Sequence, residues 1–143
     1  MPKDYPDHHD AELVLRLYEL RRESTMRASR AAMASWFPKS YDEFAAIFKG
    51  DHPNNAAFRQ VSGYWEMAYG MARHGVAHPE FLVENCTEGL FYFVRFERIL
   101  EQYRASASPR AFRNTEWVVT NTEAGKETLA FYRKRLEKIL TAV

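Results

Sequence analysis

The amino-acid sequence predicts an all-α protein, a compact single-domain bundle of five to six helices. Helix start signals recur along the chain, and apolar residues return at steps of three and four, the spacing of one face of an α-helix. The alternation of apolar and polar residues that marks a half-buried strand is almost absent. A chain of 143 residues fits one domain, so we assign residues 1–143 to a single all-helical domain.

Capping residues and prolines set the expected helix boundaries. Asp7, Ser40 and Thr122 are placed to cap the N-termini of helices. Pro79 and Pro109 each stand at a favoured first helical position. The expected helices span residues 7–35, 41–48, 55–74, 79–104, 109–119 and 123–141.

The spacing of apolar residues indicates which side chains form the core. In the helix expected over 79–104, which we predict to be loosened at Gly89, apolar residues alternate in steps of four and three. Cys86 lies within this stripe, so we expect a buried, unreactive thiol. The predicted core residues are Trp65, Leu82, Phe93, Leu100, Trp117 and Leu136.

Composition and charge exclude several classes of protein. Hydrophobic residues make up 46% of the chain and charged residues 27%, and the formal net charge is +1. This near-neutral balance argues against a general nucleic-acid binder. The single cysteine excludes an internal disulfide, the N-terminus lacks a secretory pattern, and the longest apolar run, GLFYFV, is too short to span a bilayer. We therefore predict a cytoplasmic protein with no nucleic-acid or membrane partner.

Two histidines and one glutamate are the candidates for chemistry. His74 and His78 have the i, i+4 spacing that places two ligands on one helical face, but Gly75 favours ending the helix and Pro79 restricts the residue before it. Glu66 shares a helical stripe with arginines, and we expect it to face solvent. We predict no metal and no cofactor. The alternative is a small-molecule- or metal-binding bundle that uses Glu66, His74 and His78.

Other charged side chains follow helical spacing and are expected on solvated faces. Glu80, Glu84 and Glu88 recur every fourth residue, and the first two of them suit the positive N-terminal end of a helix. Glu23 and Arg27 have the favoured orientation for an i, i+4 ion pair. We interpret both sets as structural.

The segment LFYFVRF differs from the rest of the chain. Leu90 to Val94 is apolar on every side of a helix, and such a helix has to be buried on every side. It is either a central helix of the core or a contact between subunits, and the sequence leaves both open. The candidate interaction surface consists of Phe91, Tyr92, Phe96 and Trp117.

The sequence from Phe58 to Val119 resembles a family of uncharacterised bacterial helical proteins, a domain of unknown function. The shared pattern is an aromatic, acidic and small-residue helix, a Gly-centred turn, a restart at HPEF, an aromatic-rich helix and a final segment containing Trp117. The resemblance implies an all-α fold and no activity. Some relatives carry an N-terminal membrane segment, whereas this chain has the charged sequence AELVLRLYELRRESTMRASR there, so we expect no membrane tether.

No pattern in the chain indicates catalysis. The phosphate-binding glycine loop, the nucleophile elbow and the dinucleotide-binding fingerprint are all absent. We therefore favour a non-catalytic interaction module that self-associates or binds a protein partner. A weaker hypothesis assigns the arginines of the first helix to regulation of nucleic acid.

Overall fold

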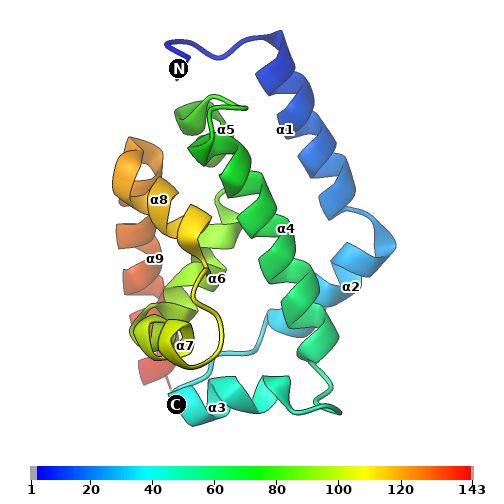
Figure 1. Cartoon of the computed structure of the whole chain (residues 1–143), viewed down its shortest axis with the longest axis vertical. Coiled ribbons are helices and arrows are strands. Elements are labelled where there is room, and N and C mark those ends of the chain that lie inside the picture. Colours follow the sequence, from blue (N-terminus) through cyan, green and yellow to red (C-terminus); the bar gives the residue numbers. More distant parts are fainter. Residues whose placement is uncertain (1–2, 143) are drawn as a thin grey trace.

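A computed structural model describes residues 3–142, and within them the protein is all-helical, with no strand. Figure 1 shows α4 running through the middle, with α1 and α2 on one side and α8 and α9 on the other. None of the helices in this part of the chain combines the length and apolar character needed to cross a membrane. The α-helices are α1 (His8–Arg21), α2 (Ser24–Met33), α3 (Tyr41–Ala45), α4 (Asn55–Arg73), α5 (Pro79–Asn85), α6 (Glu88–Phe96), α7 (Leu100–Ser106), α8 (Arg113–Asn121) and α9 (Glu123–Thr141).

The prediction of five to six helices is wrong because two expected long helices are broken. The first divides at Arg22 and Glu23, where the Glu23 carboxylate accepts hydrogen bonds from the backbone N–H groups of Thr25 and Met26 and so caps α2. Glu23 therefore caps a helix rather than pairing with Arg27. Glutamate is not a favoured N-cap type, which is why the sequence did not reveal this break.

The second break lies at Cys86 and Thr87, between α5 and α6, rather than at Gly89. Gly89 lies inside α6, where a Cβ atom would stand 2.7 Å from Trp65 Cγ on α4. Its role is therefore to let α6 approach α4 closely, and the helix is not loosened there. Beyond α6, a 3-10 turn (Glu97–Ile99) leads into α7.

Several expected helix ends are confirmed. Asp7 and Asp10 form a capping box at the start of α1, Pro79 occupies the first turn of α5, and the Thr122 hydroxyl accepts from the Gly125 N–H at the start of α9. Pro109 does not begin a helix, because α8 starts only at Arg113, after a residue with φ of 57°.

An aromatic cluster fills the end of the bundle where Phe44 of α3 packs against rings of α4, α6 and α7. The Phe44 ring lies 5.2 Å from that of Phe96, 5.6 Å from that of Phe58 and 4.8 Å from that of Tyr103. The predicted core is confirmed: Trp65, Leu82, Phe93, Leu100 and Leu136 are buried, and Trp117 is half-buried against them.

Candidate functional site

Four arginines line a hollow of about 450 Å³ between α2, α6 and α9, which we call the arginine hollow. Arg27 and Arg30 come from α2, Arg95 from α6 and Arg135 from α9. Glu88 is the single acid in the lining. Because the whole chain carries a net charge of only +1, this concentration of positive charge is local.

Arg95 is the buried member of the arginine hollow. Its side chain is 3% exposed, and its Nη1 donates to the backbone carbonyls of Met33, at 2.6 Å, and Trp36, at 3.1 Å. Within residues 3–142 no carboxylate pairs with it, and its Nε has no hydrogen-bond partner. Burial lowers the pKa of Arg95 to about 10, so the side chain is still a cation at neutral pH.

Aromatic rings hold the Arg95 guanidinium in place. Its Cζ lies 4.1 Å from the centroid of the Phe37 ring and 4.7 Å from those of Phe91 and Tyr92. The negative faces of aromatic rings attract a cation. The rings therefore stabilise the positive charge without neutralising it.

Arg30 and Glu88 form the ion pair that joins α2 to α6. Arg30 Nη2 lies 2.7 Å from Glu88 Oε1, and Arg30 Nε lies 2.9 Å from Glu88 Oε2. This is the bidentate geometry that makes an arginine–carboxylate pair strong. The hydrogen bonds that Arg30 donates to Glu88 raise the pKa of Arg30. The pair fixes one wall of the arginine hollow.

Arg27 and Arg135 remain open to solvent at the rim. Both are exposed, and in the part of the chain that the structure describes neither forms an ion pair. Arg135 lies over the ring of Phe91, with its Cζ 5.1 Å from the ring centroid. These two guanidinium groups have free donors for a ligand.

The arginine hollow has the chemistry of an anion-binding site. Guanidinium groups match carboxylates and phosphates with two parallel hydrogen bonds, and four of them face one acid that is already paired. The lining supplies no thiol, hydroxymethyl or imidazole group that would act as a nucleophile or base. The arrangement suits binding.

The structure brings together only part of the predicted interaction surface. Phe91 and Tyr92 line the arginine hollow. Phe96 is 1% exposed inside the aromatic cluster, and Trp117 lies half-buried on α8, away from the hollow. Phe96 therefore cannot contact a partner in this conformation, which corrects the predicted surface at that residue.

The sequence did not reveal the four arginines, although it held a partial signal. Arg95 is the one charged residue in LFYFVRF, and a cation inside an apolar run is expensive to bury. Arg27 and Arg30 lie one turn apart on α2. No local pattern places Arg135, because it reaches the site only through the packing of α9 on α6.

Glu66 does not face solvent, which corrects its predicted place on a wet face. It is half-buried, and its Oε1 accepts from the Thr115 N–H at 2.9 Å and from Thr115 Oγ1 at 2.7 Å. Its Oε2 accepts from the Asn114 N–H at 2.9 Å. Glu66 on α4 therefore caps the N-terminus of α8, a role usually taken by a residue of the same helix.

The alternative site of Glu66, His74 and His78 is not assembled. His78 Nδ1 accepts from the Phe81 N–H at 3.1 Å and caps α5, whereas His74 is exposed at the end of α4. Among residues 3–142 no group of three or more His, Cys, Asp and Glu side chains is placed to hold a metal ion. Glu66, His74 and His78 therefore form no such group in the part of the chain that the structure describes.

Glu80, Glu84 and Glu88 were predicted to lie on a solvated face, and the structure differs for two of them. Glu80 accepts from the backbone N–H groups of Glu123 and Ala124 at the start of α9, and Glu88 pairs with Arg30. Only Glu84 is exposed. The Cys86 thiol is buried as predicted, and burial raises its pKa to about 11, so it is not a ready nucleophile.

Of the comparisons with known proteins, only the comparison with protein families found a match. The family model described as Domain of unknown function (DUF4760) matches residues 6–122. This range includes the segment from Phe58 to Val119 whose resemblance suggested such a family. No curated protein and no solved structure matches the chain.

Proposed function

This chain belongs to the DUF4760 family, and we propose that it is a non-catalytic interaction module that binds an acidic segment of a partner protein in the arginine hollow. One observation carries the proposal: Arg95 is a buried cation without a carboxylate partner in residues 3–142, beside two solvent-exposed arginines that are also unpaired.

The energetics of Arg95 favour an anionic ligand. A buried charge that lacks an ionic partner lowers the stability of a fold, because the charge has lost its hydration. The two carbonyl contacts and three aromatic rings offset this cost only in part, since Nε has no acceptor. A carboxylate bound in the arginine hollow would supply the missing negative charge.

Geometry and charge favour a protein over a nucleic acid as partner. Arg27 and Arg135 line the arginine hollow together with Phe91, so an acidic segment with an apolar residue would meet both positive charge and an aromatic ring. A nucleic acid engages a broad basic surface, whereas this chain has a net charge of +1. We therefore propose aspartate or glutamate side chains as the recognised groups.

We propose a different protein, rather than a second copy of the chain, as the partner. Self-association was suggested by the apolar surface of LFYFVRF, and that surface is covered by the chain itself. Leu90, Phe93, Val94 and Phe96 are all buried, and α6 packs against α4, α8 and α9. The apolar character of this segment is therefore no reason to expect self-association.

Fluorescence anisotropy with a labelled hexaglutamate peptide tests this function. We expect saturable binding that weakens as the salt concentration rises, and no binding of a labelled hexaserine peptide. The double variant Arg27→Gln and Arg135→Gln should bind at least about ten-fold more weakly, since it loses two charge-assisted contacts. The matched control, Arg59→Gln with Arg110→Gln, removes two exposed arginines elsewhere and should bind like the natural chain.

Two results would contradict the proposal. Equal losses of affinity in the hollow variant and the control variant would mean that hexaglutamate senses only the overall charge. Light scattering is the second test, and it should show a monomer. A dimer that the hollow variant dissociates would make a second copy the partner.

A further inference from the structure

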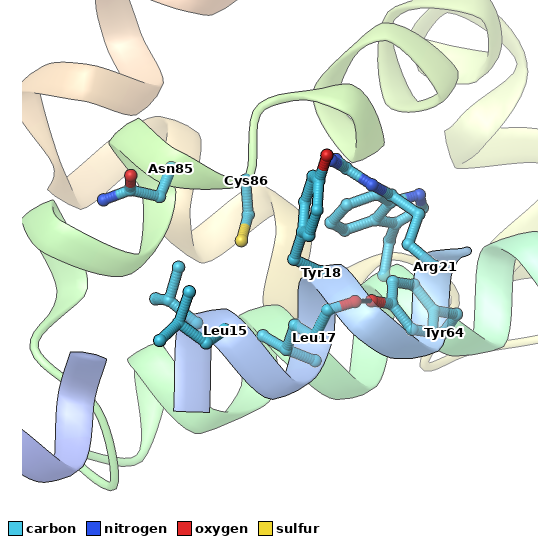
Figure 2. A pocket seen from close by; sticks show the side chains of 9 residues that line it. Leu15, Leu17, Tyr18, Arg21, Tyr64, Asn85 and Cys86 are labelled. Atoms are coloured by element: carbon cyan, nitrogen blue, oxygen red, sulfur yellow. Dashed lines mark hydrogen bonds between the residues drawn. The ribbon is translucent and has the colours of Figure 1, made fainter. Parts of the chain in front are cut away.

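A second hollow lies next to the arginine hollow, between α1, α4 and the joint that connects α5 to α6. Its volume is about 370 Å³, within the range of roughly 300–1,000 Å³ found for small-molecule sites. Figure 2 shows Leu15, Leu17, Tyr18 and Arg21 on α1 facing Cys86 and Asn85 across the cavity. It shares no residue with the arginine hollow.

Most of the cavity wall is apolar. Val14 and Leu17 of α1 line it together with Trp65 of α4. The Cys86 thiol adds a neutral group, because burial raises its pKa to about 11. The Tyr64 hydroxyl already donates to the Leu17 carbonyl. Most of the surface of a bound ligand would therefore contact apolar groups.

Two donors in the lining have no partner. Trp65 is 3% exposed, and its indole Nε1 has no hydrogen-bond acceptor. A buried donor without an acceptor is uncommon and costs about 1–3 kcal/mol. Arg21 is half-buried with its Cζ 5.1 Å from the centroid of the Tyr18 ring, and no carboxylate of residues 3–142 pairs with it.

The charge of Arg21 acts inside the cavity. Burial raises the pKa values of the Cys86 thiol and the Tyr64 hydroxyl, and the positive charge of Arg21 opposes the rise in both. Arg21, Tyr64 and Cys86 line the same cavity (Figure 2). This leaves one cationic group beside an otherwise apolar chamber.

We infer that this cavity binds a small amphiphilic carboxylate, with its apolar body among Val14, Leu17 and Trp65 and its carboxylate at Arg21. The indole N–H of Trp65 supplies a second donor to the ligand's oxygen atoms. The same ligand explains the exposed apolar side chains of α1 at the cavity, where Leu15 is 64% and Tyr18 is 50% exposed. This inference is independent of the proposed partner site.

Calorimetric titration of the full chain with decanoate and with decanol tests the inference. The two probes share an apolar chain and differ in charge. We expect decanoate to bind at one site per chain and decanol to bind at least about ten-fold more weakly. Arg21→Gln should weaken decanoate about ten-fold and leave decanol unchanged, whereas Arg16→Gln, on the same helix but outside the cavity, should alter neither.

The tryptophan contribution is tested with a matched pair. Trp65→Phe removes the indole N–H and should weaken decanoate binding several-fold, whereas Trp117→Phe, outside the cavity, should not. Because Arg21 is not in the core, Arg21→Gln should fold even if Trp65→Phe does not. No saturable binding of decanoate, equal affinity for the two probes, or equal effects of Arg21→Gln and Arg16→Gln would each overturn the inference.

Discussion

The contact between α4 and α8 and the arginine hollow are both polar regions built into an apolar bundle, and they differ in whether their polar groups are satisfied. At α4–α8 the Glu66 carboxylate receives three donors from Asn114 and Thr115, and the Asn114 amide donates to the Glu66 carbonyl. In the arginine hollow Arg95 has an unpaired Nε. The polar groups of the first region are therefore satisfied within the chain, whereas the second region keeps a buried donor without an acceptor.

Removing Glu66 should have the largest effect on stability. Glu66→Ala leaves two backbone N–H groups and one hydroxyl without their acceptor, so we expect a loss of about 2–4 kcal/mol in the free energy of unfolding. Urea denaturation followed by circular dichroism measures it. Glu84→Ala, which changes an exposed glutamate on α5, is the control and should change stability by less than about 0.5 kcal/mol. Equal effects would contradict the capping role.

A third polar region lies around Asp10. We expect it to stabilise the fold, as Glu66 does, and we expect its contribution to stability to depend on pH. Asp10 is 1% exposed and accepts from the backbone N–H groups of Asp7 and His78 and from Lys3. Burial alone would raise the pKa of its carboxyl, but these hydrogen bonds outweigh burial and lower it to about 2.

Because the folded pKa of Asp10 lies below the ordinary value of 3.8, its carboxylate stabilises the fold above pH 4. That contribution is lost as the pH falls towards 2. Asp10→Ala should cost about 1–3 kcal/mol at pH 7, and the difference from the natural chain should shrink between pH 4 and pH 2. Denaturant midpoints across this range measure it, and a constant difference would contradict the assignment.

The elements that the sequence predicted well are those with local signals. The expected helices 55–74 and 123–141 correspond to α4 (Asn55–Arg73) and α9 (Glu123–Thr141), because each has a breaker or cap at its ends and a long apolar stripe. The capping box at Asp7 and the burial of Cys86 were also predictable from near neighbours.

The features that the sequence did not predict depend on contacts between distant residues. Glu66 caps a helix that begins 47 residues later, and Arg30 meets Glu88 across 58 residues. A helical stripe shows which residues share a face, but it does not show which helix that face meets. For this reason Glu66 was placed in solvent, and the four arginines were not recognised as one site.

Substitutions at the rim of the arginine hollow should have the smallest effect on stability. Arg27 and Arg135 are exposed and unpaired in residues 3–142, so changing both to glutamine should alter the free energy of unfolding by less than about 0.5 kcal/mol. The same urea denaturation measures it. A loss as large as that expected for Glu66→Ala would mean that these arginines hold the fold together and would remove the contrast between the two regions.

The affinity of Arg95→Lys for hexaglutamate tests the central claim most directly. Lysine keeps the charge but lacks the planar group that stacks on Phe37, Phe91 and Tyr92 and binds carboxylates with two parallel bonds. We predict binding at least about ten-fold weaker than that of the natural chain, by a variant that circular dichroism shows to be folded. Unchanged affinity in the folded variant would contradict a ligand-binding role for the buried guanidinium.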